Sequence, residues 1–349
     1  MITMTTHMKL LSIIVPSFNS EKFLESCLDS LLLGIDDEIE VIVVNDGSTD
    51  KTSEIAHRYA DKHSFIKVLD KENGGHGSGI NRGLELATGL YFKVLDSDDH
   101  LDKDGLFHLL DKIKEHQKED SLPDLYVTDY YSVSVETGDK TLSSLAKRFP
   151  KDEPIIPFEQ VKQFATSEYF MMHMLFAKTS MLRETHLQVV EKTFYEDNQF
   201  VIDVIKCANT IVYLDKFIYR YVVGRDGQSI SIASADKNYS HQLRVYKAVI
   251  DELDMDEYLK MDEGRLYHFR HMVFILSTLT FFYIYIVPRK EKAKAYKEFI
   301  KYYKATKPKL YSDIKSKTPG YIYAICPPFL RGLATKLGYH REARKGGWK

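Results

Sequence analysis

The sequence predicts an α/β fold, in which a mostly parallel sheet is flanked by helices and followed by a mainly helical C-terminal region. Over the first hundred residues, short runs rich in β-branched residues alternate with amphipathic stretches at helical spacing. Polar clusters follow three of these runs, at the strand ends where open α/β sheets bind their ligands. From about Asp236 onward, helical spacing replaces the strand pattern.

The elements of the first half follow one another in a regular order. The predicted strands cover residues 10–16, 40–44, 66–69, 91–95 and 125–135, and the predicted helices begin near Asn19, Ser48, Ile80 and Asp104. A glycine-rich loop at residues 73–79 precedes the third helix. This alternation is typical of a parallel sheet covered on both faces.

The second half is more mixed. The polar stretch 136–157 is expected to be a loop or arm. Helices are expected near Phe158 and at 197–206, with a short run at 174–177 and strands at 210–214 and 217–223. We therefore divide the chain into residues 8–135, residues 136–235 of the same domain, and a helical region at 236–349.

Bulk composition describes a globular chain of 349 residues, 44% of them hydrophobic. Its three cysteines, Cys27, Cys207 and Cys326, show none of the paired spacings that bind zinc. They are expected to be reduced, packed thiols in a cytoplasmic protein. The polar residues from Met1 to His7 lack the apolar core of a secretion signal and are interpreted as a vector-derived leader.

The net charge of −2 conceals an asymmetry. From Pro288 to the end there are 17 lysines and arginines against 4 aspartates and glutamates, and the rest of the chain has 31 against 46. A cationic C-terminal region on an acidic body indicates an anionic partner surface. No nucleic-acid-binding motif accompanies this charge, so no nucleic acid is expected as a partner.

An acidic cluster follows the fourth predicted strand, at Asp96, Asp98 and Asp99. Carboxylates so close together favour a cation, and their hard oxygen atoms suit Mn²⁺ or Mg²⁺ on the phosphates of a nucleotide. The alternative is a solvated acidic turn that caps the next helix. Asp46 follows the second strand and is placed to accept a hydrogen bond from a nucleobase, although its surroundings also suit a turn.

The glycine run from Gly74 to Gly79 does not have the spacing of a dinucleotide-binding fingerprint. Its glycines alternate, and they follow the third strand, whereas the fingerprint follows the first. A nicotinamide or flavin site is therefore not expected.

Together, four segments resemble family 2 of the inverting glycosyltransferases, of the bacterial cell-surface glycan type. They are Ser-Ile-Ile-Val-Pro-Ser-Phe-Asn at 12–19, Val-Val-Asn-Asp-Gly-Ser-Thr-Asp at 43–50, Asn-Gly-Gly at 73–75 with Asn-Arg-Gly at 81–83, and Leu-Asp-Ser-Asp-Asp at 95–99. The likeness covers about residues 9–230. It implies the GT-A fold, a Rossmann-like sheet that binds a nucleotide-sugar in its first half.

The resemblance also implies roles for individual residues. Pro16, Asn19 and Asp46 would line the uridine pocket, Asp96 would face the ribose or donor sugar, and Asp98 would hold the metal, with Asp96 as second ligand. Further donor-binding candidates are Ser17, Asn73, Gly74 and Arg82. Family members often carry Ala-Arg-Asn near this last position, so that Asn81 and Arg82 compete for the place near the nucleotide.

The second half supplies the remaining candidates. Residues 195–200 look like the family's Glu-Asp segment, in which the aspartate is the general base for the acceptor hydroxyl; Asp197 takes this role, with Glu196 as second choice. Alternatively, both residues cap the helix that begins there. Arg225 and Gln228 lie in a segment similar to the one that closes over the diphosphate.

The resulting hypothesis is a metal-dependent inverting transfer from a UDP-sugar to an acceptor hydroxyl of a cell-surface glycan, such as capsule or teichoic acid, with a glycan or lipid-linked acceptor. The alternatives are a nucleotidyltransferase acting on sugar phosphates and a non-catalytic relative that binds nucleotide-sugars. His173, in an aromatic and methionine-rich run, is expected to be a packed residue and not a catalyst.

An apolar segment at residues 272–287 precedes the basic region. At 16 residues it is shorter than the roughly 20 needed to span a bilayer. Tyr296, Phe299, Ile300 and Tyr303 then recur at helical spacing among lysines, which favours peripheral docking on the inner face of the cell membrane. A buried helix or a contact in a homo-oligomer is the alternative.

Overall fold

The computed structural model describes residues 8–225, 228 and 231–315. Its strands are β1 (Leu11–Ser17), β2 (Ile39–Asp46), β3 (Ile66–Lys71), β4 (Tyr91–Val94), β5 (His100–Leu101), β6 (Leu125–Ser134), β7 (Lys140–Ser143), β8 (Ile156–Pro157), β9 (Leu175–Lys178) and β10 (Thr210–Val223). They form one sheet in the order β3-β2-β1-β4-β9-β6-β10-β5, with β7 paired to β6 and β8 to β10.

The first four strands form the parallel part of the sheet. β1 pairs in parallel with β2 and β4, and β2 pairs in parallel with β3. Both β1 and β2 are buried along their whole length, because helices cover both faces. Along β1, Ile13 and Val15 belong to one apolar core and Ile14 to the other. The predicted α/β fold is confirmed.

The second half continues the same sheet. β9 lies antiparallel between β4 and β6, and β6 pairs in parallel with β10. The two strands predicted at 210–214 and 217–223 are one strand, β10, whose register shifts between Leu214 and Phe217 and again before Tyr219. The exposed Asp215 and Lys216 lie at this irregularity, and their polarity made one strand read as two.

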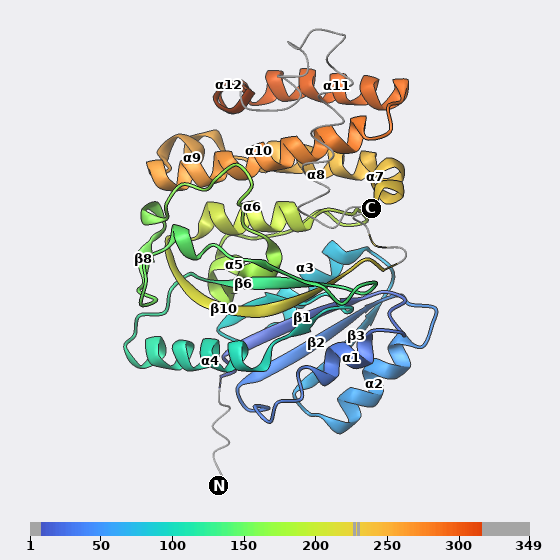
Figure 1. Ribbon diagram of the computed structural model, residues 1–349, viewed down its shortest axis with the longest axis vertical. Helices are drawn as coiled ribbons and strands as arrows, with labels where there is room; N and C mark the ends of the chain where they lie inside the picture. Colours follow the sequence, from blue (N-terminus) through green and yellow to red (C-terminus); the bar gives the residue numbers. More distant parts are fainter. Residues whose placement is uncertain (1–7, 226–227, 229–230, 316–349) are drawn as a thin grey trace.

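Helices lie on both faces of the sheet (Figure 1). One face carries α1 (Leu24–Asp29), α2 (Thr52–Lys62) and α4 (Lys103–Lys118), and the other carries α3 (His76–Leu86), α5 (Thr179–Glu184) and α6 (Asp197–Cys207). Helix α3 begins four residues before its predicted start, so most of the predicted glycine loop is helical.

The stretch between β6 and β9 is more structured than predicted. It contains β7, β8 and two 3₁₀ turns, η1 (Ala146–Arg148) and η2 (Phe158–Gln160), before a third, η3 (Met172–Met174). The helix expected near Phe158 is only the single turn η2, because the chain becomes extended at the buried Val161. From Leu145 onward, buried apolar residues anchor this stretch to the core, whereas β7 is largely exposed.

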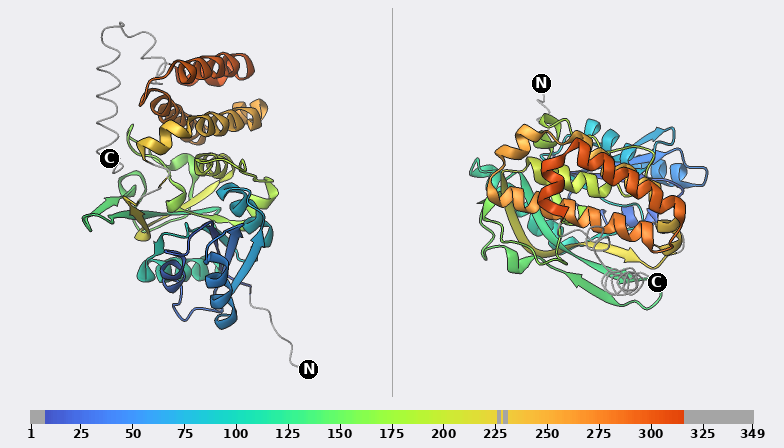
Figure 2. Two further views of the ribbon diagram at one scale, coloured as in Figure 1. Left: turned by 90° about the vertical axis from the view of Figure 1, so that its right-hand side faces the viewer. Right: turned by 90° about the horizontal axis from the view of Figure 1, so that it is seen from above.

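The C-terminal helices stack on the α6 side of the sheet (Figures 1 and 2). They are α7 (Ile232–Lys237), α8 (Tyr239–Glu252), α9 (Met255–Lys260), α10 (Glu263–Tyr285), α11 (Lys290–Thr306) and α12 (Pro308–Ile314). Helix α10 contains most of the apolar segment and buries it against α6, α8 and α11. None of the helices in the described part of the chain is both long and apolar enough to cross a membrane.

Candidate active site

The candidate site lies at the carboxyl edge of β1, β2 and β4. β1 ends at Ser17 and β2 at Asp46, and Ser17 pairs with Asn45 across the two strands. β4 runs parallel to β1 and leads into Asp96 and the acidic residues after it. Because parallel strands share one carboxyl edge, the three polar clusters of the sequence lie along the same edge.

Three carboxylates gather after β4, and oxygen atoms of Asp96, Asp98 and Asp99 lie within 4.8 Å of one another. Asp99 is fully buried and accepts hydrogen bonds from the Tyr219 hydroxyl at 2.7 Å and the Val222 N–H at 2.8 Å. Burial, together with the charges of Asp96 and Asp98, raises the pKa of Asp99 well above its usual range. Burial and the charge of Asp96 also raise the pKa of Asp98.

This cluster fits a divalent cation. Both oxygens of Asp99 already accept hydrogen bonds, whereas the side chains of Asp96 and Asp98 are 25% and 32% exposed. An all-oxygen set of partly exposed carboxylates suits Mg²⁺ or Mn²⁺. Asp98 and Asp96 are therefore the residues that would hold such an ion.

Arg225 provides a cation beside this cluster. Its guanidinium forms an ion pair with Asp98 and lies 3.9 Å from Asp99. It also lies over the ring of Phe23, 4.7 Å from the ring centroid. The Arg225 side chain is only 8% exposed, yet its Nε and Nη1 atoms have no hydrogen-bond partner within the described residues. Arg225 thus keeps two buried donor atoms that the described residues do not use.

Gln228 shapes the turn that carries Arg225. Its amide oxygen accepts a hydrogen bond from the Gly224 N–H at 2.8 Å, and its amide nitrogen donates to the Val222 carbonyl at 2.7 Å. Gly224 has a φ of 89°, a left-handed conformation that favours glycine. In this arrangement, the side chain of Gln228 supports the loop that holds Arg225.

His76, at the first turn of α3, joins the two halves of the site. Its Nε2 atom lies 3.0 Å from an Asp96 oxygen, and its Nδ1 atom lies 2.6 Å from a Glu196 oxygen. Burial alone would lower the pKa of His76, but the hydrogen bonds and charges of the two carboxylates raise it well above its usual value. Although burial would raise the pKa of Asp96, His76 lowers it to about 2.

The predicted catalytic pair stands at the start of α6. Glu196 precedes the helix and is almost fully buried; its second oxygen, Oε2, has no hydrogen-bond partner within the described residues. Asp197 is the first helical residue and accepts a hydrogen bond from the Asn198 side chain at 3.0 Å. Burial, followed by the charges of Glu196 and Asp96, raises the pKa of Asp197 to about 7. Such a carboxylate can exchange a proton near neutral pH.

Glycines in α3 and directly before it allow two close approaches of backbone. A Cβ atom on Gly77 would lie 2.5 Å from the Val190 carbonyl oxygen, and one on Gly75 would lie 3.0 Å from the Lys192 nitrogen. On the opposite side of α3, a Cβ atom on Gly83 would lie 2.2 Å from the side chain of Ile14 in β1. The alternating glycines therefore seat α3 between β1 and the segment that leads to Glu196, which explains a pattern that did not match a dinucleotide site.

Asp46 holds the start of this glycine segment. Its carboxylate accepts hydrogen bonds from the N–H groups of Gly74 and Gly75 at 2.8 and 2.7 Å, and it pairs with Lys71. The side chain of Asn73 donates to the Asp46 carbonyl at 3.0 Å. The structure thus brings Asp46, Asn73 and Gly74 together and bonds them to one another, while their role toward a donor stays a prediction.

The residues after β1 form the other side of this edge. Asn19, with a φ of 49°, accepts a hydrogen bond from the Thr49 N–H at 2.8 Å. Ser17 is buried, and its hydroxyl donates to the Val15 carbonyl at 3.1 Å. Pro16 packs against α3, because a Cβ atom on Gly79 would lie 2.8 Å from its ring. Asn19 therefore ties together two of the predicted donor-binding loops.

Asn81 and Arg82 have different surroundings on α3. The Asn81 side chain donates to the Val189 carbonyl and accepts from the Val189 N–H, at 2.9 and 3.0 Å. Arg82 pairs with Glu85 at 2.7 Å, and both side chains are about half exposed. Asn81 thus fastens the segment before α6, whereas Arg82 forms a surface ion pair. The role of Arg82 toward a donor stays a prediction.

Two buried residues below the acidic cluster were not predicted as site residues. The ammonium of Lys93, in β4, is fully buried and donates to the carbonyls of Met172, His173 and Leu175 at 3.2, 2.6 and 3.3 Å. Burial lowers the pKa of Lys93 well below its usual value. The other residue, Tyr219, bonds to Asp99. A lysine within an apolar strand was the available sequence signal.

His173 is packed, as expected. Its ring stacks on that of Tyr219, with centroids 4.4 Å apart, and lies 4.6 Å from the ring of Tyr221. Burial lowers the pKa of His173 to about 4, so the ring is neutral at physiological pH. His173, Tyr219 and Tyr221 thus pack together, and Tyr219 connects this aromatic group to Asp99 of the acidic cluster.

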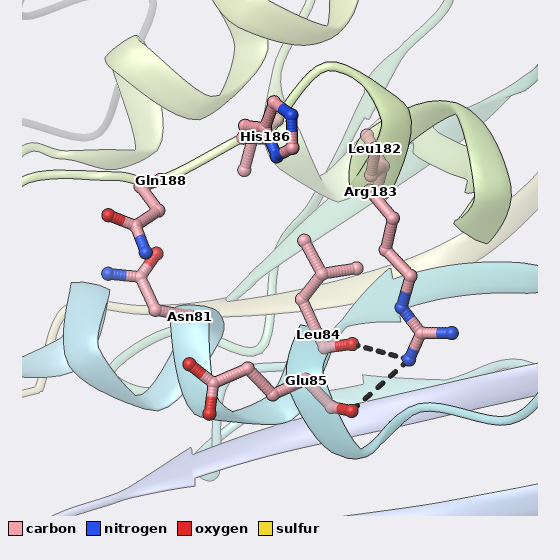
Figure 3. A pocket seen from close by; sticks show the side chains of 8 residues that line it. Asn81, Leu84, Glu85, Leu182, Arg183, His186 and Gln188 are labelled. Atoms are coloured by element: carbon pink, nitrogen blue, oxygen red, sulfur yellow. Dashed lines mark hydrogen bonds between the residues drawn. The ribbon is translucent and has the colours of Figure 1, made fainter.

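A separate cavity of about 390 Å³ lies beside the C-terminal part of α3 (Figure 3). Its lining consists of Asn81, Leu84, Glu85, Leu182, Arg183, His186, Leu187 and Gln188. Arg183 points to the end of α3 and donates to the carbonyls of Leu84, Glu85 and Ala87 at 2.8, 3.2 and 2.6 Å. The Arg183 guanidinium is occupied with the last carbonyls of α3, so it is not available to bind an anion in this cavity.

Comparison with known families identifies the first half of the chain. The model of the family described as glycosyl transferase family 2 matches residues 12–179. The matched range contains the acidic cluster and His76 but ends before Glu196, Asp197 and Arg225.

The chain is similar to two curated bacterial proteins. EpsJ of Bacillus subtilis, described as an uncharacterized glycosyltransferase, is 30% identical over 214 residues, which cover 61% of this chain and 60% of EpsJ. A poly(ribitol-phosphate) beta-glucosyltransferase of Bacillus spizizenii is 26% identical over 275 residues, 76% of this chain and 40% of that protein. The chain therefore matches less than two thirds of the length of either relative.

The fold is shared with a solved structure. S. aureus TarS, residues 1–349, aligns with a TM-score of 0.61 and 22% identity over 97% of this chain and 92% of the TarS chain. Another structure of the same TarS fragment was solved in complex with UDP-GlcNAc. At this level of identity the likeness concerns the fold alone, and it extends through the C-terminal helices.

Proposed function

Because the chain belongs to glycosyl transferase family 2 through its domain at residues 12–179, we propose that it is a metal-dependent, inverting hexosyltransferase. It transfers a sugar from a UDP-sugar to an acceptor hydroxyl of a cell-surface glycan, such as capsule or teichoic acid. Residues 8–135 bind the donor, and residues 136–235 supply the acceptor side and the base. Of the C-terminal region at 236–349, the structure describes the helices up to residue 315. The UDP-GlcNAc bound by TarS supports the choice of nucleotide.

On the donor side, Asp98 and Asp96 hold Mn²⁺ or Mg²⁺ in this proposal. The ion would neutralise charge on the diphosphate that leaves with UDP. Arg225 adds a guanidinium for the same diphosphate, since it already lies beside Asp98 with two unused donor atoms. Pro16, Ser17, Asn19, Asp46, Asn73 and Gly74 form the edge around the nucleotide, with Gln228 supporting the Arg225 turn.

On the acceptor side, Asp197 is the general base. It takes the proton from the acceptor hydroxyl as the oxygen bonds to the anomeric carbon, and UDP leaves from the opposite face of the sugar with the electrons of the broken bond. The observation that carries this proposal is the position of Asp197. Burial raises the pKa of Asp197 to about 7. The residue before it, Glu196, contacts His76, and His76 also contacts Asp96 in the acidic cluster.

Two further parts of the proposal concern where the protein acts. Cys27 and Cys207 are free thiols, which suits a reducing cytoplasm, where a UDP-sugar donor would be supplied. A lipid-linked acceptor would bring the protein to the inner face of the membrane, with docking through the basic helical region. A homo-oligomer contact through the same region is the competing proposal.

A screen of donors tests the function directly. Thermal unfolding is measured with UDP-glucose, UDP-galactose and their N-acetylamino forms, with and without Mn²⁺. A ligand at a hundred times its dissociation constant stabilises the folded state by about 2.7 kcal/mol. We expect one UDP-sugar to stabilise the wild type only with metal, and NMR of the product to show an inverted anomeric centre. No response to any UDP-sugar, or a retained configuration, would refute the proposal.

A further inference from the structure

His76 is the described side chain that contacts both the acidic cluster and the segment of the proposed base. Each of its ring nitrogens lies within hydrogen-bond distance of one carboxylate, Asp96 on one side and Glu196 on the other. The Glu196 side chain is 4% exposed, and the His76 side chain is 31% exposed. The bridge therefore lies at the boundary between the protein interior and the open site.

The backbone around His76 is built for this contact. Gly75, the residue before α3, has a φ of 83°, and its neighbour Gly74 accepts a hydrogen bond from the Lys192 N–H at 2.6 Å. A Cβ atom on Gly77 would lie 3.0 Å from the Glu196 side chain. Glycines on both sides of His76 thus let the first turn of α3 rest against residues 190–196, so that one imidazole spans the remaining gap.

We propose that His76 is a positioning residue for the transfer, which holds the donor-side Asp96 and the acceptor-side Glu196–Asp197 pair at a set separation. An inverting displacement needs its base on the opposite face of the sugar from the leaving group, and a misplacement of about 1 Å can cost on the order of 100-fold in rate. The inference rests on the proposed function, because it takes Asp96 and Asp197 to serve donor and acceptor.

The contacts of His76 also distinguish the roles of the two acidic residues at the start of α6, Glu196 and Asp197. One oxygen of Glu196 is bound by His76 and the other is buried, whereas the Asp197 carboxylate is bonded to the adjacent Asn198 and makes no contact with His76 among the described hydrogen bonds. His76 itself has both ring nitrogens engaged by carboxylates and so does not act on the acceptor hydroxyl. Glu196 is accordingly an anchor for His76, and Asp197 is left as the base.

Two amide substitutions separate the two contacts. In His76→Gln the side-chain nitrogen can take the place of Nε2 toward Asp96, and in His76→Asn it can take the place of Nδ1 toward Glu196. We expect His76→Gln to keep the wild-type KM for the donor and to lower kcat about tenfold. We expect His76→Asn to keep more of kcat and to raise the donor KM. His57→Ala, which removes a surface histidine bonded to Asp70 at 2.6 Å, is the control.

A double-variant cycle tests whether Glu196 acts through the same bridge. If it does, His76→Ala combined with Glu196→Gln should be no slower than the slower single variant, because both remove one contact. Multiplicative losses, or losses of kcat and KM that are the same in the Gln and Asn variants and follow their melting temperatures, would overturn the positioning role. UDP binding with Mn²⁺, measured by calorimetry, separates this outcome from failure of the proposed function, in which the wild type itself would bind no UDP.

Discussion

The donor half and the acceptor half of the site are held in place by different means. Asp46 is the last residue of β2 and Asp96 follows β4, so the register of a buried parallel sheet determines where they lie. Asp197 and Arg225 instead lie at a helix start and on a turn after β10. The neighbour of Asp197, Glu196, contacts His76, and Arg225 contacts Asp98. Residues in the first group are positioned by the core, whereas those in the second depend on a few polar bonds.

This difference determines what a substitution can reveal. A change at Asp98 removes a charge and its ion pair with Arg225, but it leaves the register of the sheet unchanged. A change at Arg225 or His76 removes both a charge and a contact between the halves. The predictions below compare the two groups, beginning with the largest expected effect.

Asp98→Asn should abolish measurable transfer and weaken donor binding, because it removes one of the two partly exposed carboxylates proposed to hold the metal. Excess EDTA should do the same to the wild type, and added Mn²⁺ should restore activity. Radiolabel transfer and calorimetry of UDP binding measure both effects. The matched control is Asp111→Asn, which changes a carboxylate that is 75% exposed on α4. Full activity in EDTA would rule out the metal assignment.

Asp197→Asn should lower kcat by on the order of 100-fold or more while leaving the donor KM nearly unchanged, the usual scale for losing a general base. Its position on the acceptor side is the reason for the unchanged KM. Steady-state kinetics with both substrates varied provide the measurement. If Glu196→Gln proves the more damaging of the two changes, the roles assigned to the pair must be exchanged.

The pH dependence of the wild type should report the same carboxyl group. Burial, with the charges of Glu196 and Asp96, raises the pKa of Asp197 to about 7, so the group is protonated and inactive as a base at lower pH. We expect kcat to fall about tenfold per pH unit below this value and to level off above it. Asp197→Asn should lose this slope. A wild-type rate that stays constant from pH 5 to 8 would contradict the assignment.

The residues positioned by the sheet could be predicted from the sequence, whereas the contacts that position the other group could not. The runs that became β1, β2 and β4 and the carboxylates after β4 were predicted, because buried parallel strands have a strong local pattern and determine where their ends lie. The bridge by His76 was not predicted, since His76 and Glu196 are 120 positions apart in the sequence and meet through backbone approaches that only the glycines permit. The prediction of two strands in place of β10 was wrong because a local irregularity interrupts the strand pattern, although the pairing with β6 continues on both sides of it.

Arg225→Ala should raise the donor KM about tenfold or more, since a hydrogen bond to a charged group contributes roughly 1.5–3 kcal/mol. Arg82→Ala is the informative counterpart, because Arg82 forms a surface ion pair with Glu85. Donor titrations of both variants compare Arg225, which lies beside the acidic cluster, with Arg82, whose donor-binding role is predicted only from the family resemblance. A larger effect from Arg82 would place the nucleotide along α3 instead of beside Asp98.

The smallest expected effect concerns the proposed membrane docking. The structure limits which residues of α11 are available to contact a membrane. The apolar face of α11 is used within the protein, since Tyr296, Phe299 and Tyr303 are buried in the same core as residues of α8 and α10. An interfacial helix would have to insert such a face, so docking has to rest on the exposed lysines of the outermost layer, among them Lys297 and Lys301 (Figure 2). The basic residues at 316–349 lie outside the described part of the chain.

A lysine near an anionic membrane contributes about 1 kcal/mol, so Lys297→Gln and Lys301→Gln should each weaken binding to phosphatidylserine vesicles about fivefold. Added salt should reduce binding of the wild type in the same way, because surface charges are screened. Lys62→Gln, an exposed lysine on α2 on the opposite side of the sheet, is the control. Flotation is measured with charged and neutral vesicles, alongside molecular mass by light scattering. A protein that ignores lipid charge but loses subunits when these lysines are changed uses the α11 surface to bind another copy of the chain.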